Sequence, residues 1–206
     1  EIYDAPRFLY YKGCLPDHHY PAIAVIGARS CSVYGKEMAI KFASELTKKG
    51  VQVISGLARG IDGYAHLGAL NAGGKTYGVI GNGLDFIYPA ENEKLYQRTS
   101  SMGGVISEYP MTSKALAFHF PLRNRIISGL SDGILVIEAR ERSGTLITVD
   151  CGLEQGKDIF ALPGRICDEL SKGCNCLIRN GAKLVEETED ILEEYYWVVG
   201  AEYADS

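Results

Sequence analysis

No stretch of this sequence comes close to the roughly 18–20 consecutive apolar residues that a membrane-spanning helix needs, so no membrane insertion is predicted. The basic-then-apolar layout of a signal peptide is also missing, and the chain opens on Glu-Ile-Tyr-Asp without a Met. We therefore expect a fragment of a longer cytoplasmic protein. With 206 residues, 46% of them hydrophobic, the chain is long enough to bury the core of one domain.

Metal and catalytic motifs are scarce. The six cysteines form no Cys-x-x-Cys pair, and Cys174 and Cys176 have no histidine nearby, so we expect reduced thiols and no metal site. Neither the phosphate-loop pattern Gly-x-x-x-x-Gly-Lys-Ser/Thr nor the zinc-protease pattern His-Glu-x-x-His occurs. The turn at Gly27 lacks the Gly-x-Gly-x-x-Gly spacing of dinucleotide enzymes. We predict no catalytic residues and no cofactor, which favours recognition over turnover.

The net charge of −5 argues at first against a nucleic-acid partner, but the charge is unevenly distributed. Eight acidic residues and no basic ones follow Lys183. Residues 1–185 carry 21 basic and 18 acidic residues, which is a net charge of +3. We therefore expect an acidic C-terminal tail at residues 193–206 and a main body that can present a positive cleft.

Short apolar segments alternate with helical ones from Ala22 onward. Apolar runs typical of strands buried on both faces occur at residues 22–26, 51–55, 77–80, 105–107, 134–138 and 159–162. Apolar residues at three- and four-residue steps predict helices at residues 34–49, 62–72, 91–101, 121–130 and 145–155. This alternation predicts a doubly wound α/β fold, an extended Rossmann-like domain at residues 22–192 with a mostly parallel sheet and helices on both faces. Residues 1–21 are expected to form an arm or linker.

In such a sheet, ligands bind outside the carboxyl ends of the strands. Glycines, arginines and hydroxyl residues follow four of the predicted strands, and Asp62 is the expected N-cap of the second helix. Each feature alone is equally typical of a turn, a helix cap or a core aromatic residue. Together they predict a polyanion site, because glycine allows close approach, arginine grips phosphate and helix N-termini attract anions. The expected site residues are Gly27, Arg29, Ser30, Ser55, Gly56, Phe120, Arg123, Asn124, Arg125, Ser143, Gly144 and Thr145.

A series of motifs stands in order along the chain, at residues 25–29, 55–62, 81–85, 107–110, 120–127, 143–148, 162–164 and 177–182. In this order they resemble the motifs of the DNA processing protein A family, also called DprA or Smf. The resemblance covers residues 22–192, which is nearly the whole chain. Generic Rossmann patterning does not produce so many ordered matches.

The resemblance implies a cytoplasmic bacterial protein that binds and protects single-stranded DNA and loads the recombinase RecA onto it in natural transformation. It also implies a homodimer without a cofactor. The predicted site suggests how the strand would bind. Arg29 would hold a backbone phosphate, and the Gly27 and Gly56 amides would add hydrogen bonds. Arg123 and Arg125 would add charge, and Phe120 would stack on an unpaired base. Ser143 and Thr145, at a helix N-terminus, would complete the anion pocket.

One position departs from the family pattern. Many members have a lysine three residues before the aromatic residue of the Phe-Pro-x-Arg-Asn-Arg motif, and the resemblance makes that lysine a DNA contact. Ala117 stands there in this chain, and Lys114 in the same loop is the expected substitute. Ala28 also stands where the family often has Ser or Thr.

Two alternatives stay open. Residues 138–148 also resemble a group of Rossmann-like phosphoribohydrolases, which would make the protein a nucleotide-binding or nucleotide-cleaving enzyme. The glutamate of their Pro-Gly-Gly-x-Gly-Thr-x-x-Glu segment is missing here. The absent lysine at Ala117 would fit an interaction scaffold with a vestigial pocket.

Overall fold

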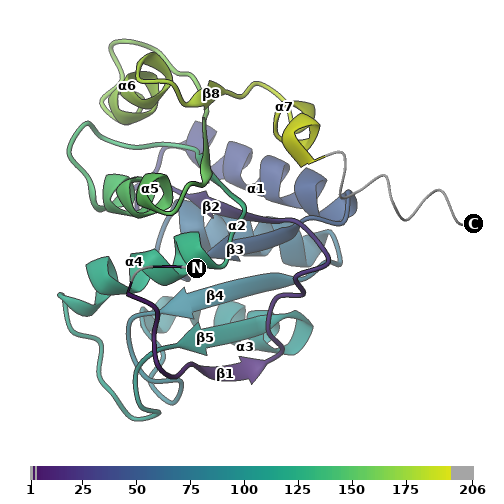
Figure 1. The fold of residues 1–206 in the computed structure, drawn as a ribbon, viewed down its shortest axis with the longest axis vertical. Coiled ribbons are helices and arrows are strands. Elements are labelled where there is room, and N and C mark those ends of the chain that lie inside the picture. The colour runs from purple at the N-terminus through teal and green to yellow at the C-terminus, as the bar shows by residue number, and fades with distance from the viewer. Residues whose placement is uncertain (1, 3, 196–206) are drawn as a thin grey trace, which may run out of the picture.

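Eight strands form one twisted sheet with helices on both faces (Figure 1). The structure is a computed structural model and describes residue 2 and residues 4–195. The strand order is β1-β5-β4-β3-β2-β6-β7-β8, and every neighbouring pair is parallel except β1 and β5. The predicted doubly wound α/β class is confirmed.

All six predicted strands are present, with ends within two residues of those expected. They are β2 (Ala22–Ile26), β3 (Gln52–Ser55), β4 (Thr76–Ile80), β5 (Gly104–Ser107), β6 (Gly133–Val136) and β7 (Asp158–Ala161). Two strands were not predicted, β1 (Tyr10–Gly13) and β8 (Lys183–Leu184). Both lie at edges of the sheet, where exposed residues replace the buried apolar run that marks a central strand.

The five predicted helices are also present. They are α1 (Val33–Lys48), α2 (Ile61–Asn71), α3 (Glu93–Met102), α4 (His119–Gly129) and α5 (Gly144–Glu154). Short 3-10 turns precede α3 and follow α7, as η1 (Ala90–Asn92) and η2 (Glu193–Tyr195). The short helices α6 (Lys172–Arg179) and α7 (Glu189–Leu192) were not predicted. None of the helices in the described part of the chain is long and apolar enough to cross a membrane.

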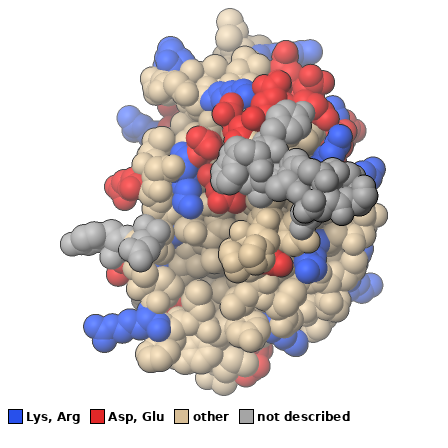
Figure 2. All heavy atoms as spheres, turned by 45° about the vertical axis from the view of Figure 1, so that its right-hand side comes forward, with Lys and Arg blue, Asp and Glu red and all other residues tan. Residues whose placement is uncertain are grey.

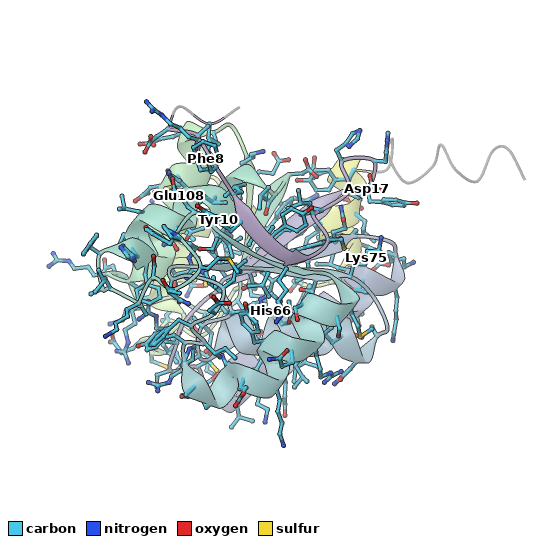
Figure 3. The ribbon with its side chains drawn as sticks, turned by 90° about the horizontal axis from the view of Figure 1, so that it is seen from below. Phe8, Tyr10, Asp17, His66, Lys75 and Glu108 are labelled. Carbon is cyan, nitrogen blue, oxygen red and sulfur yellow. The ribbon has the colours of Figure 1, made fainter. Side chains whose placement is uncertain are left out.

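The segment before residue 22 is not the irregular arm that we expected. Residues 10–13 form β1, which pairs antiparallel with β5 and closes that edge of the sheet. Figure 3 looks onto this edge, with Tyr10 on the strand and Asp17 in the segment that leads toward β2. Gly13 has a φ of +92°, and a Cβ there would lie 2.3 Å from the Gly103 carbonyl oxygen. The turn that ends β1 therefore requires glycine.

Two apolar layers cover the sheet. Helices α1, α2 and α7 pack on one face, where Phe42 and Leu46 are fully buried, and α3 covers the same face next to β4 and β5. Helices α4, α5 and α6 pack on the other face around Ile126 and Ile127. Tyr195 belongs to the first layer and donates a hydrogen bond to Asp158. Tyr195 of the expected acidic tail therefore packs on the core, Glu193 and Glu194 are exposed, and residues 196–206 lie outside the described residues.

The acidic residues gather at one end of α1. Glu189 lies 3.7 Å from Lys49, and Thr188 donates to Glu45, so α7 is held against the C-terminal end of that helix. Figure 2 shows acidic side chains gathered in the upper part of one face of the molecule. The N-terminal end of α1 lies at the opposite, carboxyl edge of the central strands. The acidic charge is therefore separated from that edge by the length of α1, 16 residues or about 24 Å.

Candidate functional site

The strand order reverses between β2 and β6, which are neighbours in the sheet although eight elements separate them in the chain. The chain leaves β2 for α1 on one face and leaves β6 for α5 on the other, which opens a crevice at their carboxyl ends. A cavity of about 390 Å³ lies there. It is lined by nine of the residues expected from the sequence: Gly27, Arg29, Ser30, Phe120, Arg123, Asn124, Ser143, Gly144 and Thr145.

A smaller cavity of about 40 Å³ adjoins the first one. The two share Arg29, Ala58 and Phe120, and the second one also contains Gly56 and Tyr88. The exposed guanidinium of Arg29 lies 5.4 Å from the centre of the half-buried Phe120 ring. The ring of Tyr88 lies 5.6 Å from that of Phe120. A cation and two aromatic rings therefore stand at the junction of the two cavities.

The N-terminus of α5 faces the larger cavity. Ser143 is its N-cap, as its place before the helix predicted, but its side chain makes no capping hydrogen bond. The first turn of α5 contains no acidic residue. The first N–H groups of the helix and the positive end of its dipole are therefore available to an anion.

Three buried polar atoms along these cavities have no hydrogen-bond partner within the described chain. They are Nε of Arg123, Oγ of Ser143 and Oδ1 of Asn82. Buried polar groups almost always have a partner, and those without one are common where a ligand or water binds. The wall of the site is therefore suited to a polar ligand.

Arg123 forms the floor of the site rather than an exposed contact. Its side chain is buried, and it donates hydrogen bonds to the carbonyl oxygens of Gly56, at 2.8 Å, and of Val79. The pKa of Arg123 is lowered to about 10, mainly by burial and also by the charge of Arg29, while the Asp62 carboxylate opposes this shift. The guanidinium remains charged and holds together the chain segments at the ends of β3 and β4.

Gly56 is required by this arrangement. A Cβ at Gly56 would lie 2.4 Å from Oδ2 of Asp62 and 2.6 Å from Nη1 of Arg123. Asp62 accepts a hydrogen bond from the Gly56 amide, and burial raises the pKa of Asp62 although Arg123 and Arg29 act in the opposite direction. The prediction that Asp62 caps α2 is wrong. Its carboxylate turns toward Gly56, and Gly60 is the N-cap.

Three of the expected site residues do not face either cavity. Ser55 is fully buried, and its hydroxyl donates to the Val25 carbonyl at 2.7 Å. Arg125 makes two hydrogen bonds to Glu108, which Figure 3 labels, and a salt bridge to Asp4. Residues two apart on a helix point to different sides, so Arg125 cannot share a cavity with Arg123. Lys114 is exposed in the loop before α4 and lines neither cavity.

Glu138 has a structural role that the sequence did not reveal. Its buried carboxylate accepts hydrogen bonds from the Ser32 amide at 2.9 Å and the Ser32 hydroxyl at 2.5 Å. Ser32 in turn caps α1 by accepting from the Gly35 amide. A Cβ at Gly35 would lie 2.2 Å from the Glu138 carboxylate. This contact fastens the loop that carries Arg29 to the end of β6.

Residues 129–133, Gly-Leu-Ser-Asp-Gly, match the Gly-x-Ser-x-Gly pattern of hydrolases. This segment joins α4 to β6, whereas the nucleophile elbow of hydrolases lies on a strand-to-helix turn. Ser131 is buried, and its hydroxyl donates to the Ile127 carbonyl at 2.8 Å. The pattern therefore lies in the connection between α4 and β6, and its Ser131 is not exposed as a nucleophile.

Comparison with known proteins agrees with this architecture. The model of the family described as DNA recombination-mediator protein A matches residues 1–196. The chain belongs to this family. It is 49% identical over 195 residues to DNA processing protein DprA of Streptococcus pneumoniae, covering 95% of this chain and 69% of that protein. It is 48% identical to Protein Smf of Escherichia coli, covering 92% of this chain and 51% of that protein. The chain thus spans about half to two thirds of these family members.

Solved structures of the family have the same fold. The X-ray structure of DprA from Streptococcus pneumoniae superimposes with a TM-score of 0.89 and covers 94% of this chain and 68% of that one. A structure of DNA processing protein A from Helicobacter pylori has a TM-score of 0.85 and 31% identity, covering 94% of this chain and 89% of that one. That structure is described as showing a single-stranded DNA binding mode.

Proposed function

We propose that the paired cavities bind single-stranded DNA. The observation that carries the proposal is the junction of the two cavities, where Arg29 lies over the Phe120 ring. On one side of this junction is the turn at Gly56, and on the other is the N-terminus of α5, which has no side-chain capping hydrogen bond. Arg29 and the α5 amide groups suit a backbone phosphate. Phe120 offers a half-exposed ring on which an unpaired base can stack, a contact that contributes about 1–3 kcal/mol per base without reading the sequence.

The family supports the choice of ligand. The Helicobacter pylori relative is described by its single-stranded DNA binding mode, and the family by its role as a recombination mediator. A duplex keeps its bases paired and stacked, so it could use the phosphate contacts but not the stacking on Phe120. The site therefore favours a single strand.

The first test replaces Arg29 by alanine. We expect the affinity for a thymidine oligonucleotide to fall about tenfold or more, because a charge-assisted phosphate contact is lost, and the salt slope to decrease by about 0.7. Lys48→Ala, which removes an exposed lysine from the far end of α1, is the matched control. Unchanged affinity of the Arg29 variant would show that the strand binds elsewhere.

The second measurement adds unlabelled duplex as a competitor to the same binding assay at two salt concentrations. We expect duplex to compete poorly and binding to weaken as salt rises. Equal competition by duplex would show that surface charge alone attracts DNA, and would remove the role assigned to Phe120.

We also propose that the site binds rather than cleaves. Among the described residues that line the larger cavity, the one carboxylic acid is Asp62, which lies buried against the Gly56 amide. Burial raises the pKa of Asp62, a property that acid catalysts share, so nucleotide cleavage has a specific test. Incubation with AMP should release no adenine, and release of adenine that depends on Asp62 would establish the enzyme instead.

Membership of the recombination-mediator family supports a proposal for the cellular role. We propose that the protein acts in the cytoplasm, protects incoming single strands and loads RecA onto them in natural transformation and recombination. A homodimer would join two sites on one strand and raise the overall affinity without any new contact. Sedimentation of the protein alone and together with RecA tests both partners. A monomer that does not sediment with RecA in the presence of a single strand would contradict this role.

A further inference from the structure

Beside the second cavity lies a third hollow, a groove that shares Arg59 with it. It has a volume of about 430 Å³ and runs between α2 and α3. Arg59, in the turn before α2, lines both this groove and the second cavity. Arg29 lines both the first and the second cavity. The three hollows therefore follow one another from the start of α5, across the ends of β2 and β3, to the outer side of α2.

The groove has the charge of a polyanion site. Three of its ten lining residues are basic, and Glu91 is the single acidic one. Lys94 and Arg98 stand one turn apart on α3, so they point to the same side, and both are exposed. Opposite them, α2 contributes the ring of Tyr64.

Two further contacts tune the charge of the groove. Lys36 of α1 lies over the Tyr64 ring, 5.1 Å from its centre, and adds a fourth cation beside the groove. Glu91 makes two hydrogen bonds to the guanidinium of Arg59, one of them at 3.2 Å. Arg59 lowers the pKa of Glu91, so this carboxylate is ionised and competes with any phosphate for Arg59.

We propose that a bound single strand continues from Arg29 past Arg59 into the groove between α2 and α3. There Lys94 and Arg98 bind the following phosphates, and the Tyr64 ring contacts a base or sugar. Glu91 limits the affinity of this extension because it occupies Arg59. This inference rests on the proposed function of the main site. It adds a path and a direction for the strand, away from α5 and toward α3.

The test compares two thymidine oligonucleotides, of about four and about twelve nucleotides, which span the usual site sizes of single-strand binders. The double variant Lys94→Gln with Arg98→Gln should bind the longer strand about tenfold more weakly at about 0.15 M salt, because two phosphate contacts each contribute about 0.7 to the salt slope. Its affinity for the shorter strand, which the main site can hold alone, should not change.

A gain-of-affinity variant guards against effects of misfolding. Glu91→Gln releases Arg59 and should strengthen binding of the longer strand severalfold. It should strengthen the shorter strand less, because Arg59 also lines the second cavity but the phosphates in the groove belong to the longer strand alone. Lys48→Gln, which changes the same kind of charge at the far end of α1, should alter neither affinity.

The outcomes separate this inference from the proposed function. If Arg29→Ala weakens binding of both strands and the double variant Lys94→Gln with Arg98→Gln weakens binding of neither, the main site stands and the path through the groove is overturned. If Arg29→Ala has no effect on either strand, the proposed function itself fails. If this double variant weakens binding of both strands equally, the path is also overturned, because Lys94 and Arg98 would then belong to the main site.

Discussion

At the scale of single residues, the two arginines of the site have different roles although the sequence suggests the same one. Arg29 is exposed and lies over Phe120, whereas Arg123 is buried and donates to backbone carbonyls. Arg29 follows β2, and Arg123 lies in the first half of α4, and both are at the carboxyl edge of the parallel strands. Only the packing around each guanidinium shows that Arg29 is open to the cavities and that Arg123 supports the fold.

We predict that Arg123→Met lowers the free energy of unfolding by about 2–5 kcal/mol, because it leaves buried Asp62 without its nearest compensating charge and removes two hydrogen bonds. Urea unfolding measures this change. Arg29→Ala, at an exposed position, should change the same free energy by less than about 0.5 kcal/mol. A loss of under about 1 kcal/mol in the Arg123 variant would show that this side chain does not hold the strand ends together.

His66 provides a prediction about pH. It is fully buried on α2, its Nδ1 lies 2.7 Å from the Thr76 hydroxyl, and its Nε2 has no partner in the described chain. Burial, with a smaller contribution from Arg123, lowers its pKa to about 3. The unfolded chain therefore binds a proton that the folded chain does not, and the folded state loses stability as the pH falls from about 6.5 toward 3.

We expect His66→Gln to remove this part of the acid sensitivity. Between pH 7 and about pH 5 the wild-type chain should lose about 2 kcal/mol more stability than the variant. Unfolding curves at the two pH values give the difference. The exposed His18→Gln serves as the control and should follow the wild type, and a His66 variant with the same pH slope as the wild type would refute the assignment.

At the scale of elements, contacts between the strand ends and the helix starts shape the site. Glu138 joins the end of β6 to the N-cap of α1, and between that cap and β2 lies the loop that carries Arg29. The positive end of the α1 dipole compensates the buried carboxylate. This contact belongs to neither element alone, since it depends on β2 and β6 being neighbours in the sheet.

Glu138→Gln should lower the free energy of unfolding by about 1–3 kcal/mol, because it removes a charge-assisted pair of hydrogen bonds at a helix N-terminus. Glu141→Gln, three residues later and exposed, is the matched control and should be neutral within about 0.5 kcal/mol. Chemical denaturation compares the two variants. Equal stability of both would mean that the cap of α1 does not depend on Glu138.

At the scale of the whole molecule, the acidic residues around α7 and the candidate site are at opposite ends of α1. The acidic residues around α7 lie at its C-terminal end, and the cavities lie at its N-terminal end, about 24 Å away. At about 0.15 M salt the Debye length is about 8 Å, so the acidic end hardly affects an anion at the site. A net charge of −5 is therefore compatible with a polyanionic ligand.

Neutralising this end should have an effect that depends on salt. The double variant Glu186→Gln with Glu187→Gln should change single-strand affinity by less than about twofold at about 0.15 M salt, and should raise it more at about 0.01 M, where the Debye length reaches about 30 Å. Binding titrations at both concentrations check this. An equal increase at both would place the acidic residues beside the bound strand.

The sequence alone determined the α/β class, the six central strands and the five long helices, because a strand buried on both faces and an amphipathic helix each leave a local apolar pattern. It also determined the edge of the sheet at which the site lies, since loops after parallel strands meet at their carboxyl ends. The resemblance of its motifs correctly indicated the family.

The tertiary structure alone decided which predicted residues line the two cavities. Ser55, at the end of β3, and Arg125, on α4, are residue types that suit an anion site. In the folded chain, however, Ser55 donates its hydrogen bond to Val25, and Arg125 donates to Glu108. Strand β1 is likewise defined by its pairing with β5 and not by a buried apolar run. Burial and long-range hydrogen bonds depend on elements that are distant in the chain, and no local pattern records them.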